Sequence, residues 1–223
     1  MEKYELTEET KTLPFGPVLH RIRAVREFTL ANGERIAPGT LGGWVEKEKN
    51  LSHKNNAWVA GDARVYGNAR VCGNALVDGN ALVDGNAEVY GNAEVYGDAR
   101  VYDNARVYDN AEVYGDARVY GNARVYGNAL VDGNALVYGN AIIRKNVVIA
   151  DSFDFAIAGP AGSRENFTTY CIAADLVFCG CFSGTLEQFA AAVEKTHAAH
   201  PAYLAQYRAM IAYFSTLRSL HTK

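Results

Sequence analysis

Polar residues that could bind an anion gather in one glycine-rich stretch of the C-terminal part. Gly162, Ser163 and Arg164 follow Gly159-Pro160-Ala161, and Thr168 and Thr169 come shortly afterwards. A turn of this composition offers backbone N–H groups, a hydroxyl and a guanidinium to an oxyanion. We therefore predict a ligand-binding site formed by Gly162, Ser163, Arg164, Thr168 and Thr169. The alternative is an ordinary β-turn with a solvated arginine.

Thiols and imidazoles could support metal or acid–base chemistry, but their spacing does not favour it. Cys179-Gly180-Cys181 would place two thiols on one side of a strand, with Cys171 and His197 as conceivable further zinc ligands. This spacing is not that of a known zinc unit, so we expect reduced thiols, no metal and no cofactor. None of the five histidines falls between Ala57 and Asn146; they are His20, His53, His197, His200 and His221. We therefore expect no catalytic residue.

The element that must position these residues is a repeat with a period of six. From Ala57 to Ser152 the chain runs as Ala-x-Val-x-Gly-Asn or close variants. Four residues of in/out alternation followed by a two-residue corner fit this period, whereas a 3.6-residue helix does not. Alanine and valine would point inward, and Gly with Asn or Asp would form the corner. The sequence thus predicts a mainly β fold with a parallel β-solenoid.

These hexads resemble the hexapeptide-repeat, left-handed β-helix superfamily. The rows Val-Tyr-Gly-Asn-Ala-Arg match its pattern of aliphatic, variable, small, Asn, small and variable residues. The resemblance implies a left-handed helix with three hexads per coil, about five coils in all, and assembly as a homotrimer. Enzymes of this superfamily usually interrupt the helix with a loop and use a histidine as general base. The alternative function is thus an acyltransferase that uses His53 or His197 at a subunit interface.

Outward tyrosines line up when residues 18 apart are stacked. One column contains Tyr102 and Tyr120, and another contains Tyr90, Tyr108 and Tyr126. Such ladders could simply stabilise adjacent coils. They could also form an interface, because aromatic residues and arginine are enriched where proteins meet. We therefore predict these five tyrosines as interface residues, with copies of the same chain as the first partner.

Both ends of the chain differ from the repeat. Residues 1–56 are irregular and charged, with a hairpin expected at Ala31-Asn32-Gly33-Glu34, and we interpret them as a cap closed by Trp44 and Trp58. Residues 57–152 form the solenoid, and residues 153–223 form a C-terminal α+β module. In that module the sequence predicts strands at 153–158, 167–171 and 176–182. A helix hairpin should follow, opened by the capping box Thr185-x-x-Gln188 and by Pro201.

Composition excludes several functional classes. The chain has 223 residues and a net charge of −3, so nucleic acid is not an expected partner. Neither a membrane helix nor a signal peptide is evident, and we expect a cytoplasmic protein. The whole chain resembles phage- and prophage-associated hexapeptide-repeat proteins that are often labelled transferases. We expect a non-enzymatic phage-type binding protein that engages a host protein or sequesters a nucleotide-like anion in counter-defence; the other alternative is a structural spacer.

Overall fold

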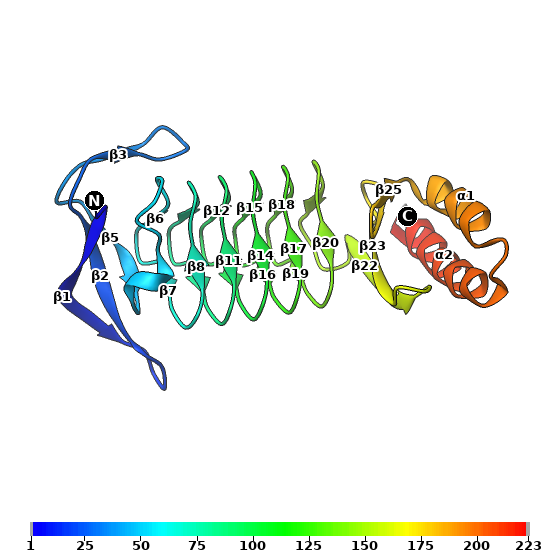
Figure 1. Cartoon of the computed structure of the whole chain (residues 1–223), viewed down its shortest axis with the longest axis horizontal. Coiled ribbons are helices and arrows are strands. Elements are labelled where there is room, and N and C mark those ends of the chain that lie inside the picture. Colours follow the sequence, from blue (N-terminus) through cyan, green and yellow to red (C-terminus); the bar gives the residue numbers. More distant parts are fainter. Residues whose placement is uncertain (1, 222–223) are drawn as a thin grey trace.

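A computed structural model describes residues 2–221 and shows a long parallel β-solenoid with a smaller unit at each end (Figure 1). The chain winds through about six turns, and its strands form three parallel sheets. The mainly β solenoid predicted from the repeat is therefore confirmed. An additional turn precedes the repeats, because β5 (Leu41–Val45), within the predicted cap, already pairs in parallel with β7 (Arg64–Val65).

Each solenoid sheet takes one strand from each turn, except that the second sheet has only an isolated bridge, Leu51 to Val71, in the first turn. The first sheet continues from β5 and β7 with β10 (Leu82–Val83), β13 (Arg100–Val101), β16 (Arg118–Val119) and β19 (Leu136–Val137). The second comprises β8 (Arg70–Val71), β11 (Glu88–Val89), β14 (Arg106–Val107), β17 (Arg124–Val125) and β20 (Ile142–Ile143). The third comprises β6 (Trp58–Val59), β9 (Leu76–Val77), β12 (Glu94–Val95), β15 (Glu112–Val113), β18 (Leu130–Val131) and β21 (Val148–Ile149).

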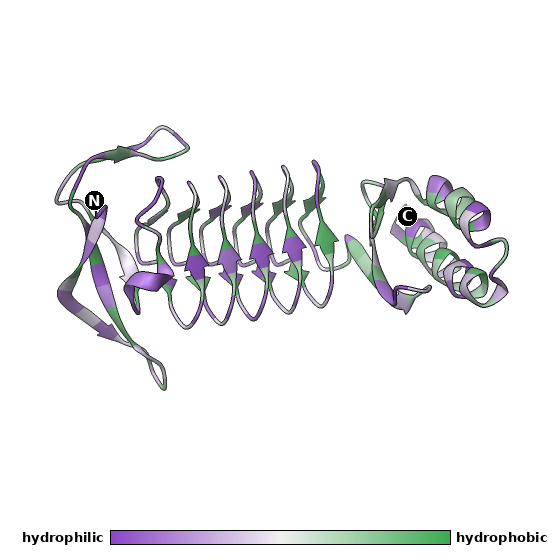
Figure 2. Cartoon of the chain, in the orientation of Figure 1, coloured by the Kyte–Doolittle hydropathy of each residue, from purple (hydrophilic) through white to green (hydrophobic). Residues whose placement is uncertain are grey.

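The register of the strands follows the period of the sequence. Residues 18 apart pair across neighbouring turns, as Leu82 does with Arg100, so one turn contains three hexads. Alanine and valine of each hexad fill the interior; Ala99 and Val101, for example, are fully buried. The residue between them points outward and is often charged, which gives the alternating colours along the strands in Figure 2.

The corners of the solenoid explain the glycines and asparagines. Gly97 has a φ of +71°, and a Cβ there would lie 3.1 Å from the backbone nitrogen of Gly115 on the next turn. Glycine is the residue that tolerates both constraints. Two corners also carry ladders of asparagine amides in which each Nδ2 donates to the Oδ1 one turn further on, as Asn92 does to Asn110 at 3.0 Å. Side-chain hydrogen bonds thus join successive turns at these corners.

The N-terminal unit covers the first turn. Strand β1 (Tyr4–Thr12) pairs antiparallel with β2 (Val18–Ala24), and β2 pairs with β5. The predicted hairpin is formed by β3 (Phe28–Thr29) and β4 (Arg35–Ile36), and a short 3-10 helix, η1 (Glu48–Asn50), follows β5. Trp58 is buried against Phe28 in the core, as expected. Trp44 is also buried but lies outside this core cluster, and the centroid of its ring is 5.4 Å from the Lys11 ammonium and 5.0 Å from the Arg21 guanidinium.

Lys3 is buried in this unit, and no carboxylate of the described residues pairs with it. Its ammonium group donates to the carbonyl oxygens of Asn55 and Ala57 and lies 5.4 Å from the centroid of the Phe28 ring. Burial, with a smaller contribution from Arg26, lowers the pKa of Lys3 to about 7. The folded protein therefore releases a proton that the unfolded chain retains up to its ordinary pKa of 10.5.

We expect the Lys3→Met variant to lose a pH dependence of the unfolding free energy that the native protein has. Between pH 7 and about 9 the unfolded chain binds more protons at Lys3 than the folded chain, so the unfolding free energy of the native protein rises with pH. Methionine does not titrate. The unfolding free energy of the variant relative to that of the native protein should therefore fall by about 2 kcal/mol over this pH range. Denaturant unfolding of both proteins at several pH values checks this. A difference in unfolding free energy between the two proteins that stays constant with pH would contradict this prediction.

The C-terminal module closes the other end of the solenoid. Strands β22 (Phe155–Ala161), β23 (Asn166–Cys171), β24 (Leu176–Cys179) and β25 (Phe182–Gly184) form an antiparallel sheet in this order. The predicted helices are α1 (Leu186–His197) and α2 (Pro201–His221), and the Thr185–Gln188 capping box is present. Arg144, on the last turn, joins the two units by donating to Tyr126 Oη at 3.1 Å and to the Phe182 carbonyl at 3.0 Å. No helix of the described residues is long and apolar enough to cross a membrane.

Two adjacent threonines of β23 give a matched test of this closure. Thr169 Oγ1 accepts a hydrogen bond from the Ile142 backbone N–H of β20 at 2.9 Å, whereas the buried Thr168 hydroxyl has no partner among the described residues. We expect Thr169→Val to lower the unfolding free energy by about 1 kcal/mol, because it leaves the partly buried Ile142 N–H without its acceptor. Thr168→Val should leave the unfolding free energy unchanged or raise it, because the hydroxyl that it removes has no hydrogen-bond partner in the described part of the chain. Denaturant unfolding checks both, and equal losses would contradict this account.

Candidate anion-binding cavity

A cavity of about 480 Å³ lies in the C-terminal module between the β-sheet and the two helices. Ser163 and Arg164 line it from the turn between β22 and β23, and Asn166 from the first position of β23. The end of β24, the following turn and the start of β25 contribute Cys179, Gly180, Cys181 and Phe182. Helix α1 contributes Phe189, Ala192, Val193, Thr196 and His197, and α2 contributes Tyr207. This volume is within the usual range for small-molecule sites. No lining residue is acidic, so the only formal charge that the lining carries at neutral pH is positive.

The glycine-rich turn is held against α2, which fixes where its polar groups lie. The Gly162 N–H donates to Gln206 Oε1 at 3.0 Å, and a Cβ on Gly162 would lie 2.6 Å from the Tyr207 hydroxyl oxygen. Gly162 therefore packs against α2 rather than facing the cavity, and its N–H already has an acceptor. Ser163 and Arg164 are exposed at the cavity, and no carboxylate of the described residues forms an ion pair with Arg164.

The structure separates the two threonines from the rest of the predicted site. Thr168 and Thr169 are buried and do not line the cavity. As described above, Thr169 binds the last turn of the solenoid instead. Of the five predicted ligand residues, Ser163 and Arg164 are thus brought together at the cavity, with Gly162 behind them.

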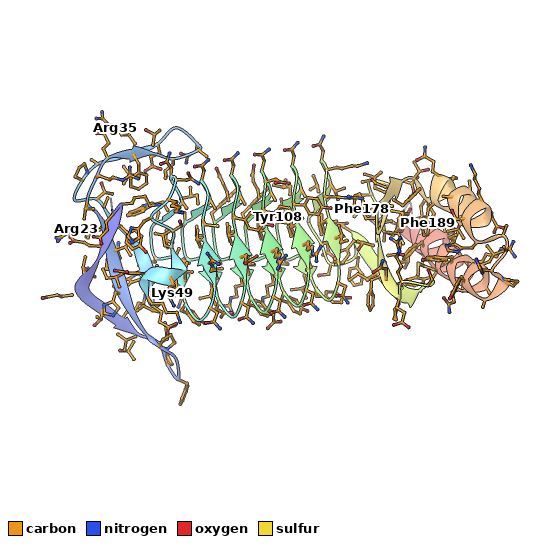
Figure 3. The ribbon with its side chains drawn as sticks, in the orientation of Figure 1. Arg23, Arg35, Lys49, Tyr108, Phe178 and Phe189 are labelled. Carbon is orange, nitrogen blue, oxygen red and sulfur yellow. The ribbon has the colours of Figure 1, made fainter. Side chains whose placement is uncertain are left out.

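Aromatic rings form the cavity wall, and sequence reasoning missed them. The His197 ring stacks on Tyr207 with centroids 4.9 Å apart, and Phe189 lies 5.2 Å from Phe182 and 6.0 Å from Tyr207. Figure 3 shows Phe189 on the α1 side of the module and Phe178 at the junction with the solenoid. Burial, with a smaller effect from Cys179, raises the pKa of Tyr207 to about 12, so its phenol stays neutral at physiological pH. The spacing of these residues on α1 and α2 indicated only a packed helix face.

The predicted arrangement of thiols is corrected by the structure. The strand expected at 176–182 is two strands, because β24 ends at Cys179 and Gly180 turns with a φ of +56°. Cys181 consequently lies in a turn rather than beside Cys179 on a strand. Cys171 belongs to the core shared with the solenoid, whereas Cys179 packs against the core of the helices. Among the described residues no group of three or more His, Cys, Asp or Glu side chains could hold a metal ion.

The predicted tyrosine ladders are present on the solenoid. Ring centroids are 4.8 Å apart for Tyr90 and Tyr108, 4.6 Å for Tyr108 and Tyr126, and 4.9 Å for Tyr102 and Tyr120, all with nearly parallel planes. Figure 3 shows Tyr108 midway along the solenoid. The rings therefore stack within one chain. Their role as interface residues stays a prediction.

Charge is unevenly divided among the three sheets. The acidic face comprises Glu94 and Glu112 on strands of the third sheet and Asp78 and Asp132 directly after two of its strands. The arginine face comprises Arg64, Arg100 and Arg118 on strands of the first sheet, where one acidic residue, Asp84, directly follows β10. Glu94 is directly paired with Glu112, and Arg100 with Arg118. No ion pair within the described residues involves any of the seven side chains that make up the two faces. Burial and the neighbouring Glu112 raise the pKa of Glu94, as expected for unneutralised carboxylates.

Comparison with known proteins supports the class that the fold defines. Four segments match the YdcK beta solenoid repeat family, namely residues 63–79, 99–115, 117–133 and 123–139. All four lie within the three parallel sheets, so the central part of this chain is a β-solenoid whose repeats are similar to those of that family. A comparison with curated proteins finds no match to the chain. Both terminal units lie outside the matched segments, and the resemblance to phage-associated proteins stays a prediction.

Proposed function

We propose that this chain is a non-enzymatic binding protein whose C-terminal cavity takes a small organic anion with an aromatic ring, such as a nucleotide. One observation carries the proposal: the unpaired guanidinium of Arg164 lies at a cavity without acidic residues and with an aromatic wall. An arginine binds a phosphate or carboxylate with two parallel hydrogen bonds. The rings of Phe182, Phe189, His197 and Tyr207 offer apolar surface to a base.

The cavity favours ligand sequestration over the other roles expected from the sequence. A structural spacer would need no such cavity. An acyltransferase that uses His53 would need this histidine free to act as a base, but its Nδ1 accepts the Lys3 backbone N–H at 3.2 Å. In the neutral tautomer of His53 that this hydrogen bond favours, Nε2 carries the proton and cannot accept one. Counter-defence by a phage would be one setting for such sequestration.

Assembly into a homotrimer is part of the proposal. A ring of identical subunits is built from heterologous contacts, in which two different surfaces meet at every interface. The acidic and arginine faces are two such surfaces with opposite charge. Because both belong to one solenoid, their charged columns share the same repeat of about 4.8 Å. With parallel axes, Glu94 and Glu112 of one copy can meet Arg100 and Arg118 of the next in register.

Calorimetric titration of the full chain with adenosine monophosphate tests the ligand. We expect saturable binding with one site per chain, and weaker binding of ribose 5-phosphate, which keeps the phosphate but lacks the base. Absence of binding to either compound, or equal affinity for both, would contradict the proposed ligand class.

A further inference from the structure

We propose a second anion-binding site, selective for compact phosphates, where the N-terminal unit meets the first complete turn of the solenoid. A cavity of about 660 Å³ lies there between residues 47–53 and residues 67–72. It is at the opposite end of the molecule from the nucleotide cavity, and the proposed function does not use it. The inference is therefore independent of the C-terminal site.

The cavity arises from a local change in the repeat. Trp44 pairs with Arg64 and Leu51 with Val71, which is a spacing of 20 residues, whereas Trp58 pairs with Leu76 at the usual 18. Two additional residues must therefore lie between Leu51 and Trp58. This longer corner contains His53, and η1 precedes it. The corner and η1 together form one side of the cavity.

Cations without partners line the cavity. Arg70 and Lys49 are exposed in it, and no carboxylate of the described residues is within ion-pair distance of either. The carboxylate nearest to Arg70 along its column is that of Glu88, which instead pairs with Arg106 at 3.2 Å. Lys47 is 3.7 Å from Glu46, and Glu48 is the one acidic residue among those that line the cavity. The remaining positive charge favours an anion.

Neutral donors in the same cavity complete the site. The His53 ring stacks on Tyr4 with centroids 4.3 Å apart, and its Nδ1 accepts the Lys3 backbone N–H. The Nε2–H is then the remaining polar group of the ring and can donate to a ligand. Burial raises the pKa of the Cys72 thiol, which lines the cavity as a neutral group. Cys72 therefore places no negative charge beside a bound anion.

The lining also indicates what kind of anion fits. Apart from the His53 imidazole, no aromatic ring lines this cavity, in contrast to the wall of four rings in the C-terminal module. A nucleobase would find no stacking surface here, whereas a phosphate or pyrophosphate group needs only cations and hydrogen-bond donors. The expected ligand is therefore a free compact phosphate such as pyrophosphate.

Titration of the full chain with inorganic pyrophosphate tests this site. We use the Arg164→Gln protein as background, so that the C-terminal site contributes little to the measured binding and the result does not depend on the proposed function. Adding Arg70→Gln should weaken pyrophosphate binding at least about tenfold, because a charge-assisted hydrogen bond is lost. Arg124→Gln is the matched control: it removes an exposed arginine of the same column, outside the cavity, and should change the affinity less than about twofold.

Three outcomes would overturn the proposal. They are no detectable pyrophosphate binding in the Arg164→Gln background, equal weakening by Arg70→Gln and Arg124→Gln, and unchanged binding in the Arg70→Gln variant. Lys49→Gln provides a second variant in the same cavity, and we expect it also to weaken binding. Supporting results would include a shift of the His53 ring resonances with pyrophosphate that is absent when adenosine monophosphate is added.

Discussion

The Arg164→Gln variant should bind adenosine monophosphate about 10- to 100-fold more weakly than the native protein, because a charge-assisted bidentate contact contributes about 1.5–3 kcal/mol. Glutamine keeps hydrogen-bonding capacity but removes the one unpaired positive charge of the cavity. Stability should be nearly unchanged, since Arg164 is exposed and makes no ion pair within the described residues. Calorimetric titration measures the affinity, and thermal unfolding checks the fold.

Arg208→Gln is the matched control for this variant. It removes the same charge from the same module, but the guanidinium of Arg208 is paired with Glu194 at 2.7 Å on the surface of the helices. We expect an affinity within about twofold of the native value, because surface charges contribute little at physiological salt. Equal losses in both variants would show that net charge, rather than a site at Arg164, governs binding.

Reversal of the acidic face should dissociate the assembly into single chains. In the variant Glu94→Arg/Glu112→Arg, arginines would oppose Arg100 and Arg118 of the neighbouring copy, and like charges at an interface cost several kcal/mol. Sedimentation velocity should show a shift from trimer to monomer. Combining this reversal with Arg100→Glu/Arg118→Glu in one chain should restore the trimer, because every copy then again offers two faces of opposite charge.

A control with the same change in net charge separates the interface from general repulsion. Glu8→Arg/Glu9→Arg places the reversal on exposed residues of β1, the edge strand of the first sheet in the N-terminal unit, three strands from Arg64, and should leave the trimer intact. Added salt should weaken the native assembly, because it screens the pairing. A native protein that sediments as a monomer, or a chain with both faces reversed that fails to associate, would contradict the proposed interface.

Sequence periodicity was sufficient to predict the solenoid, its buried alanines and valines, and the stacked tyrosines. These features depend on contacts that recur every 18 residues, so each hexad determines the environment of the hexad one turn further on. The hairpin at Asn32-Gly33 and the capping box at Thr185 were predictable because their hydrogen bonds are local. The first turn was missed because β5 has no hexad pattern and is recognised only through its pairing with β7.

The candidate site was less predictable, because it is made by tertiary contacts. Arg164 was identified from its turn, but the aromatic wall requires the packing of α1 on α2, which places His197 against Tyr207. Thr168 and Thr169 are close to Arg164 in sequence, yet strand β23 carries them away from the cavity. The separation of charge between the acidic and arginine faces could not be seen in the net charge of the solenoid, because that sum combines residues of different faces.

The most direct test of the central claim is an NMR titration that follows the histidine ring resonances of the full chain as adenosine monophosphate is added. Of the histidines in the described residues, His197 alone lines the C-terminal cavity, and His53 lies at the opposite end of the solenoid. We predict a saturable shift of the His197 resonances with the His53 resonances unchanged. Unperturbed His197 resonances at saturating nucleotide, or equal shifts of both histidines, would contradict a nucleotide site in the C-terminal module.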